Sequence, residues 1–274
     1  MDRRGARWCR PRGRAAPGGM DRGEGGRRSG RPRRLPVRGG GRGGPRGADT
    51  RGSRSRALRR RRPGRGGGPM TAFVETLRRA RIVAVLRADG AAALEAQLDA
   101  VREGGVRAIE VTTTAEGWQQ VLRRAASEAE ADVLVGAGTV TTIEQAEQAL
   151  EAGARFLVSP YRVPDAVSAI ARTAAGGGVP FVPGGFTPAE VAEAAQVGDG
   201  VAKLFPAATG GLAHLKAIRD VLPSVSIMPT GGIGPDDAAD WLAAGAVAVG
   251  LGGALVRQPV ARIRDLMSSV GAGA

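Results

Sequence analysis

Residues 82–112 read IVAVLRADGAAALEAQLDAVREGGVRAIEVT. The run Ile82–Leu86 is continuously apolar, as in a strand buried on both faces, and Ala91–Glu103 carries its larger apolar residues at helical spacing. A glycine pair at 104–105 then precedes a second strand-like run, Arg107–Val111, at a place where a left-handed helix cap is expected. A strand, a helix and a second buried strand in this order predict a parallel βαβ unit.

The same pattern repeats along the rest of the chain. Segments with helical spacing, such as Glu144–Ala152 and Pro188–Ala195, alternate with short apolar runs, and Ala72–Ala80 is expected to be a helix that closes one end of the fold. Eight such runs begin 21 to 26 residues apart: Ile82–Leu86, Arg107–Val111, Val133–Ala137, Phe156–Ser159, Pro180–Pro183, Val201–Leu204, Val225–Pro229 and Ala246–Gly250. They predict an α/β fold, a (β/α)8 TIM barrel over residues 70–274. The alternative is an open doubly wound sheet, but no GxGxxG motif follows the first strand.

The charge of the chain is unevenly distributed. Residues 1–69 contain 23 Arg against four acidic residues, a net charge of +19, whereas residues 70–274 carry 17 basic and 22 acidic residues, a net charge of −5. Residues 1–69 consist mainly of Arg, Gly, Pro and Ala and have almost no aliphatic pattern. Such a segment cannot bury enough apolar surface to offset its chain entropy, so we expect it to be disordered.

Several interpretations of residues 1–69 remain open. An arginine- and glycine-rich tail can bind nucleic acid, but Trp8 is its only aromatic residue for stacking on bases. Its glycine and proline content disfavours the amphipathic helix of a transit peptide, and it has no apolar core of a secretory signal. The favoured interpretation is a start-site artefact, because G+C-rich DNA encodes these amino acids and Met70 opens a well-patterned chain. Nucleic-acid binding is therefore not expected.

The single cysteine and single histidine exclude several classes of site. Cys9 leaves no internal disulfide, so a reducing compartment, the cytoplasm, is the expected location. With His214 as the only histidine, a His- or Cys-ligated catalytic zinc site cannot be assembled, and no metal is expected. No apolar run is long enough for a transmembrane helix, so membrane association is not expected.

Polar side chains stand at the carboxyl ends of the predicted strands, where a barrel collects its catalytic groups: Arg87, Glu110, Thr112, Thr139, Ser159, Lys203 and Thr230. Lys203 lies in the otherwise apolar run GVAKLFP, and an ammonium group is costly to bury. Removal from water favours a neutral amine, which is the form that attacks a carbonyl carbon. Glu110 is a candidate base at the end of another strand. The alternative for both residues is a structural ion pair, and Lys216 is expected to be a surface charge.

Two glycine pairs follow the seventh and eighth predicted strands. Backbone amides of Gly231-Gly232 and Gly252-Gly253, with the helix N-termini after them, can hold a phosphate dianion without a basic side chain. Tight turns also require glycine, so each pair alone is weak evidence. Two pairs in adjacent units favour a phosphate site.

An ordered set of short motifs runs along the predicted barrel: IVAVLR (82–87), EGGVRAIEVT (103–112), VGAGTV (135–140), VSP (158–160), VPG (182–184), KLFPA (203–207) and PTGGI (229–233). This set resembles the class I aldolases of 2-keto-3-deoxy-6-phosphogluconate (KDPG) and 4-hydroxy-2-oxoglutarate (KHG). The resemblance extends over residues 71–267, which is effectively the whole predicted barrel.

The resemblance implies an aldolase that cleaves KDPG into pyruvate and glyceraldehyde 3-phosphate without a metal or another cofactor. It implies that Lys203 forms an imine with the substrate C2 carbonyl and that Glu110 moves protons, through water. Arg87 would bind the substrate carboxylate, since other members carry the same Val-Leu-Arg. The remaining implied contacts are Thr139 and Pro160 at the pyruvate end, Phe205 beside the imine, and Gly231, Gly232, Gly252 and Gly253 at the phosphate. Family members usually form trimers, so a homotrimer is expected.

The chain departs from the family pattern at three places. Thr114 stands where some members have a carboxylate-binding arginine, and Arg87 can supply that charge from another strand. Gly253 stands where members often have a serine that binds the phosphate, so one hydrogen-bond donor is lost. The sequence Gly-Gly-Phe at 184–186 is an unusual form of the loop after the fifth strand, and the sequence alone does not explain it.

Other functions remain as alternatives to KDPG cleavage. KHG and 2-keto-3-deoxy-6-phosphogalactonate are rival substrates for the same lysine chemistry. An isomerase, epimerase or synthase barrel would share the glycine loops without needing Lys203. Nucleic-acid binding through residues 1–69 is the non-enzymatic alternative.

Overall fold

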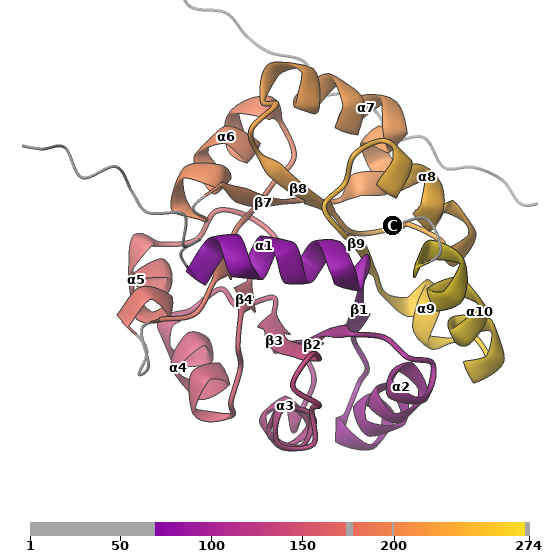
Figure 1. Ribbon diagram of the computed structural model, residues 1–274. Helices are drawn as coiled ribbons and strands as arrows, with labels where there is room; N and C mark the ends of the chain where they lie inside the picture. Colours follow the sequence, from indigo (N-terminus) through magenta and orange to yellow (C-terminus); the bar gives the residue numbers. More distant parts are fainter. Residues whose placement is uncertain (1–68, 174–177, 199, 272–274) are drawn as a thin grey trace, which may run out of the picture. The chain divides into compact units, whose positions relative to one another are not determined.

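The computed structural model describes residues 69–173, 178–198 and 200–271. The expectation of disorder for residues 1–69 therefore lies outside the described residues, except at Pro69, where the first helix begins. Helices and strands alternate as the sequence pattern predicts (Figure 1). The strands are β1 (Ile82–Leu86), β2 (Ala108–Thr112), β3 (Leu134–Gly138), β4 (Leu157–Val158), β5 (Phe181–Val182), β6 (Gly184–Gly185), β7 (Val201–Leu204), β8 (Ser226–Pro229) and β9 (Val249–Leu251). The helices are α1 (Pro69–Ala80), α2 (Ala91–Glu103), α3 (Trp118–Ser127), α4 (Ile143–Glu151), α5 (Asp165–Thr173), α6 (Pro188–Val197), α7 (Ala207–Val221), the 3-10 helix η1 (Pro235–Asp237), α8 (Ala238–Ala243), α9 (Gly253–Val256) and α10 (Val260–Gly271).

The strands are parallel and form a curled sheet in two hydrogen-bonded parts. One part has the strand order β5-β4-β3-β2-β1-β9 and the other has the order β6-β7-β8. Only Pro183 separates β5 from β6: it has no N–H to donate and so interrupts the ladder, while its carbonyl accepts from the Lys203 amide at 2.9 Å. At the other edge, Thr230 forms a parallel bridge with Gly250 of β9. With helices surrounding the sheet (Figure 1), the fold is barrel-like, which favours the predicted barrel over the open sheet.

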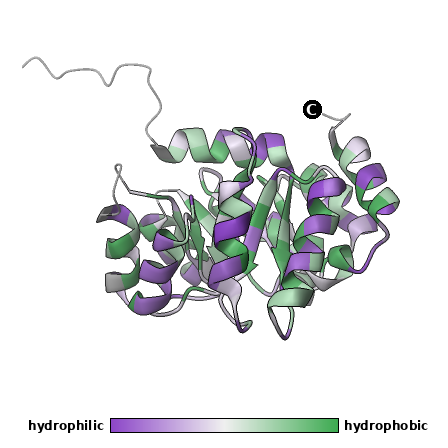
Figure 2. Ribbon diagram, turned by 90° about the horizontal axis from the view of Figure 1, so that it is seen from below, coloured by the Kyte–Doolittle hydropathy of each residue, from purple (hydrophilic) through white to green (hydrophobic). Residues whose placement is uncertain are grey.

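Alternate strand residues point to opposite faces of the sheet, and they divide the core into two clusters. The outer cluster packs the strands against the surrounding helices and includes Ile82, Ala84 and Leu86 of β1. The inner cluster joins strand residues such as Val83 to Phe73 of α1. The helix α1 therefore covers one end of the sheet, as predicted, and Figure 2 shows it lying across the apolar strands.

The inner cluster also determines which polar residues face the interior. Ala108 of β2 and Val201 of β7 belong to this cluster. Glu110 and Lys203 lie two residues further along the same strands, so their side chains point into the same interior space, nearer the carboxyl ends.

The bounds of β1, β7 and α2 agree with the sequence-based prediction, whereas the last strand begins three residues later than predicted. It was expected at Ala246–Gly250 but runs over Val249–Leu251. Residues 245 and 246 form the turn that ends α8, so they are not part of the strand. Gly245 has a φ of 94°, and the Ala246 amide donates to the Trp241 carbonyl at 3.1 Å. None of the helices that the structure describes has the length and apolar character required to span a bilayer.

Candidate active site

Lys203 and Glu110 meet inside the barrel although their strands are not neighbours. The Lys203 Nζ lies 3.4 Å from the Glu110 Oε1, and the two residues are only 3% and 0% exposed. Glu110 Oε2 is also buried and has no hydrogen-bond partner among the described residues. Buried carboxylate oxygens are nearly always satisfied, so this oxygen is an acceptor suited to a substrate hydroxyl or a water molecule.

A glycine on the neighbouring strand makes room for this carboxylate. Gly138 is paired with Thr112 in the β2–β3 register and therefore lies beside Glu110. A Cβ at Gly138 would be 2.5 Å from the Glu110 Cγ and would overlap its carboxylate. The side chain of Glu110 thus reaches Lys203 through space that only a glycine leaves open.

Arg87 is held at the end of β1 by contacts on both its backbone and its side chain. Its amide donates to Gln97 Oε1 and its carbonyl accepts from Gln97 Nε2, each at 3.0 Å. Its guanidinium donates to Thr139 Oγ1 at 3.0 Å. Thr139 has a φ of 57°, which is rare for a β-branched residue, and its carbonyl accepts from Thr113 Oγ1 at 2.8 Å. Strain of this kind costs roughly 1–3 kcal/mol and is concentrated at functional sites.

Phe205 lies between Lys203 and the first glycine pair. The centre of its ring is 5.5 Å from the Lys203 Nζ, which places the cation over an aromatic face. A Cβ at Gly231 would be 2.8 Å from the same ring, and both Gly231 and Gly232 have positive φ angles, 97° and 78°. Glycine is therefore required at this turn, both for its backbone conformation and for the close approach of Phe205.

A pocket of about 550 Å³ opens at the carboxyl ends of the strands. It brings together most of the predicted site residues: Arg87, Lys203, Phe205, Gly231, Gly232, Gly252 and Gly253. Glu110, Thr139 and Pro160 are not among its lining residues. Glu110 contacts the lining residue Lys203, and Thr139 accepts a hydrogen bond from the lining residue Arg87.

The glycine pairs line this pocket without long helices behind them. The helix α9, which begins at Gly253, has four residues, and α8 has six. Because the helix dipole needs several aligned turns, the expected help from helix N-termini is small here. Anion binding at these loops would rest on the individual amides.

Pro160 lies beside β6 rather than in the pocket, and this contact explains part of the unusual Gly-Gly-Phe sequence. A Cβ at Gly184 would be within 2.8 Å of the Ser159 carbonyl and would overlap the Pro160 backbone. Phe186 then packs against the His214 ring, with 4.6 Å between ring centres, and its carbonyl accepts from His214 Nε2 at 2.8 Å. The only histidine therefore fixes a loop.

Several other polar residues have structural roles. Thr112 donates its hydroxyl to the Leu86 carbonyl at 2.9 Å, and Ser159 donates to the Tyr161 carbonyl at 2.8 Å. Thr230 differs from these two residues, because it lines the pocket and its Oγ1 is buried without a hydrogen-bond partner among the described residues. Lys216 is exposed on α7, as predicted.

Sequence reasoning missed two residues of the site, Gln97 and Arg257. Gln97 lies inside α2 and is indistinguishable in the sequence from any other polar helix residue. Arg257 lines the pocket just after α9. Its position four residues after Gly253 was the available signal, since one short helical turn brings it back over that glycine.

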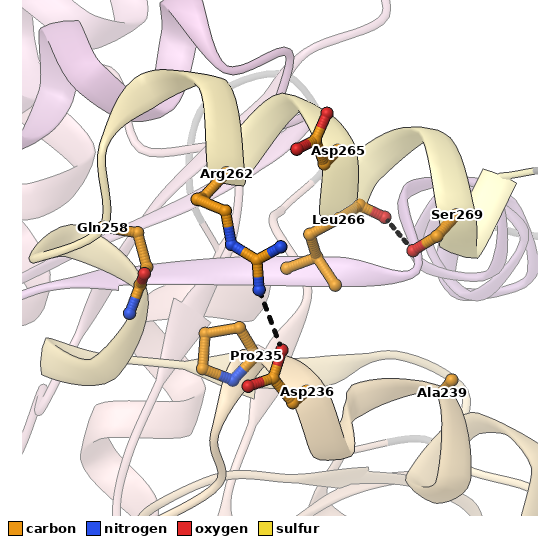
Figure 3. A pocket seen from close by; sticks show the side chains of 8 residues that line it. All are labelled: Pro235, Asp236, Ala239, Gln258, Arg262, Asp265, Leu266 and Ser269. Atoms are coloured by element: carbon orange, nitrogen blue, oxygen red, sulfur yellow. Dashed lines mark hydrogen bonds and ion pairs between the residues drawn. The ribbon is translucent and has the colours of Figure 1, made fainter.

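A second pocket, of about 280 Å³, lies between η1 and α10 (Figure 3). Its charged residues include Arg262, which is paired with Asp236 at 3.2 Å, and Asp265. Both members of the ion pair are more than half exposed, and the pocket shares no residue with the one at Lys203. An exposed pair of this kind contributes little energy and indicates no chemistry.

Comparison with known proteins agrees with this geometry. The sequence model of the family "KDPG and KHG aldolase" matches residues 73–268. The chain is 37% identical over 175 residues to the 2-dehydro-3-deoxy-phosphogluconate aldolase of Treponema pallidum, covering 64% of this chain and 81% of that protein. It is 31% identical over 177 residues to the 2-dehydro-3-deoxy-6-phosphogalactonate aldolase of Escherichia coli, covering 64% of this chain and 84% of that protein.

Solved structures give the same result. The KDPG aldolase of Legionella pneumophila, solved with pyruvate captured as a covalent carbinolamine intermediate, superimposes with a TM-score of 0.60 and 28% identity. The match covers 72% of this chain and 97% of that one. The family model, these relatives and the Legionella pneumophila structure all indicate an aldolase, which is a lyase. The chain belongs to the KDPG and KHG aldolase family.

Proposed function

We propose that the chain is a Schiff-base aldolase that cleaves KDPG into pyruvate and glyceraldehyde 3-phosphate, with Lys203 as the nucleophile and Glu110 as the proton-transfer group. The observation that carries this proposal is the buried contact of 3.4 Å between the Lys203 Nζ and the Glu110 Oε1 at the floor of a cationic pocket. An amine that attacks a carbonyl needs an adjacent group to take and return protons, and this pair supplies both.

The reaction begins when the neutral Lys203 amine adds to the C2 carbonyl and forms a carbinolamine. Loss of water gives a protonated imine, which withdraws electrons from C3. Glu110, directly or through water, removes the proton of the C4 hydroxyl, the C3–C4 bond breaks, and its electron pair forms the enamine. Glyceraldehyde 3-phosphate leaves, C3 is protonated, and addition of water releases pyruvate and regenerates the amine.

The other predicted residues bind the two charged ends of this substrate. Arg87, fixed by Gln97 and bonded to Thr139, would bind the carboxylate through its guanidinium. Phe205 packs beside the imine, and Pro160 supports the pyruvate end through β6. The amides of Gly231, Gly232, Gly252 and Gly253 would hold the phosphate.

The relatives include enzymes named for phosphogluconate, phosphogalactonate and KHG, and all of these substrates would use the same lysine. Arg87 and Arg257 in the pocket favour a substrate with an anionic group at each end, and the phosphorylated acids and the dicarboxylate KHG both have this property. KDPG is proposed among them because several of the relatives are named for it.

Trapping with borohydride tests the lysine chemistry directly. Incubation with pyruvate and sodium borohydride should add one reduced pyruvate adduct to the peptide that carries Lys203, as read by mass spectrometry. Lys216, the other lysine of the chain, is the internal control and should remain unmodified. EDTA should leave cleavage unchanged. Adduct on Lys216 alone, or activity abolished by the chelator, would overturn the assignment.

A Lys203→Ala variant separates this proposal from the isomerase or synthase alternative. Cleavage should fall to background, because no other buried amine is present among the described residues. Full activity of that variant on a phosphorylated substrate would favour the alternative.

We also propose that the architecture is the complete (β/α)8 barrel over residues 70–274, with β5 and β6 together forming the fifth strand. Residues 1–69 would have no role in catalysis. The family resemblance supports a homotrimer. Light scattering of the chain with and without residues 1–69 would test whether it is a trimer and whether the trimer needs those residues.

A further inference from the structure

Arg257 lies against the backbone of Gly253 at the mouth of the Lys203 pocket. A Cβ at position 253 would be 2.6 Å from one terminal guanidinium nitrogen of Arg257, 3.5 Å from its Cζ and 3.7 Å from the other terminal nitrogen. All three distances refer to one planar group, so the guanidinium covers the space that a side chain at 253 would occupy. Glycine at 253 is what allows Arg257 to take this position.

The guanidinium of Arg257 has no ion-pair or hydrogen-bond partner within the described part of the chain. By contrast, Arg102, Arg107, Arg124 and Arg162 on the helical layer each contact a carboxylate. Five N–H donors arranged in a plane match the oxygens of a phosphate or carboxylate. An arginine with free donors at the edge of a pocket is therefore available to a ligand.

The charge of the pocket points to an anionic ligand. Its lining includes Arg87, Lys203 and Arg257 and no acidic residue. The pocket of Figure 3 is different, because Arg262 shares it with Asp236 and Asp265. A basic lining without an acidic residue thus distinguishes the pocket at the strand ends from the pocket of Figure 3.

The two arginines serve different ends of that ligand. The guanidinium of Arg87 reaches toward Thr139, which follows β3. Arg257 follows β9, on the other side of β1 in the sheet order β3-β2-β1-β9. Because Arg87 is directed toward β3 and Arg257 lies over Gly253, one arginine is directed away from the glycine pairs and the other lies beside them.

We propose that Arg257 is a specificity-determining residue that binds the phosphate of the substrate, together with the amides of the two glycine pairs. This inference rests on the proposed aldolase function. Gly253 carries no side-chain donor, and the guanidinium that covers it supplies a charged one. The enzyme would therefore discriminate between phosphorylated and unphosphorylated keto acids through a side chain as well as through amides.

The test compares kcat/KM on KDPG with kcat/KM on 2-keto-3-deoxygluconate, the same acid without its phosphate, for wild type, Arg257→Ala and Arg257→Gln. The ratio of the two values should fall on the order of 10- to 100-fold in both variants, mainly through KM for KDPG, because a hydrogen-bonded charge contact is lost. Arg262→Ala is the matched control: it removes one nearby arginine that lies outside the pocket, and its ratio should equal that of wild type. A ratio within twofold of wild type in Arg257→Ala would overturn the proposal.

A second variant distinguishes binding from a structural effect. Gly253→Ser adds a hydroxyl at the phosphate but brings a Cβ into the space of Arg257. In the Arg257→Ala background that conflict is absent, so Gly253→Ser should raise the substrate ratio again, whereas alone it should lower it. Equal effects of Gly253→Ser in both backgrounds would contradict the proposed geometry.

Failure of this inference and failure of the aldolase function give different results. If the wild-type chain is not trapped by pyruvate and borohydride, the aldolase function itself is wrong. If the wild-type chain is trapped at Lys203 and cleaves KDPG while Arg257→Ala retains its substrate ratio, only the role of Arg257 is wrong. Competitive inhibition by inorganic phosphate at constant ionic strength gives an independent measure and should weaken in Arg257→Ala.

Discussion

Gly138→Ala should disable the proton-transfer step while leaving Lys203 in place. In the structure, a Cβ at position 138 would lie 2.5 Å from the Glu110 Cγ and would overlap the carboxylate. An ordinary carbon–carbon contact is about 3.5 to 4 Å, so the Glu110 side chain must move by roughly 1 Å or more. The backbone at 138 lies within a regular strand, where alanine is acceptable.

The size of the effect follows from this displacement. A misplacement of about 1 Å in a catalytic constellation costs roughly 10²-fold in rate. Overpacking of the interior should also lower the free energy of unfolding, by about 1–3 kcal/mol. We therefore expect kcat/KM for KDPG cleavage to fall about 100-fold in a protein that remains folded.

The assay needs a measure of folded, competent sites beside the rate. Prolonged borohydride trapping with pyruvate counts sites whose Lys203 still reacts, and circular dichroism reports the folded fraction. Gly90→Ala is the matched control, because a Cβ there meets nothing within 4 Å and its φ of −170° is extended backbone. Wild-type activity in Gly138→Ala would refute the reasoning that Glu110 depends on this space.

Three further predictions concern stability. Lys203→Met should lower the free energy of unfolding by about 3 kcal/mol because it leaves the Glu110 carboxylate buried without its cation, and Glu110→Gln in the same chain should recover much of that loss in urea denaturation. Hydrogen bonds, first of all from the Thr187 amide, lower the pKa of Glu190 below 4.5. The stabilisation from Glu190 is thus present above about pH 4.5 and is lost as the pH falls through the lowered folded-state pKa; the Tm difference between wild type and Glu190→Gln should shrink toward zero on acidification. Thr230→Val removes a buried hydroxyl that has no partner among the described residues, so its Tm should equal or exceed that of wild type.

The sequence was sufficient to predict Lys203 and Glu110 because each is an ionisable residue in an apolar strand. Two-residue periodicity places each side chain on one face of its strand, but both faces are apolar, so the inward direction is known only from the structure. The prediction needed no knowledge of which strands are neighbours. Their contact across the interior depends on both residues lying near the carboxyl ends and on the space that Gly138 leaves open.

Gly138 and Arg257 could not be found in this way. The role of Gly138 depends on the register between β2 and β3, which pairs Thr112 with Gly138, and periodicity does not determine register. The role of Arg257 depends on α9 lasting one turn, so that its end folds back over Gly253. The start of β9 was misplaced for a related reason. The turn after Gly245 includes apolar residues whose sequence is typical of a strand.

The interior of the barrel shows why a carboxylate can be placed there at all. Three glycines on the inner face each lie against a larger neighbour. Gly136 lies against Phe156, Gly138 against Glu110 and Gly250 against Thr230, and a Cβ at any of the three would come within 2.8 Å of that neighbour's side chain. A narrow barrel can hold side chains of different size only if large and small positions are matched between strands. Phe156 and Glu110 are thus each accommodated by a glycine on a neighbouring strand. The space lets Phe156 fill the core and lets Glu110 reach Lys203. The position of Glu110 beside Lys203 therefore depends as much on Gly138 as on Glu110 itself, and the two residues must be considered together.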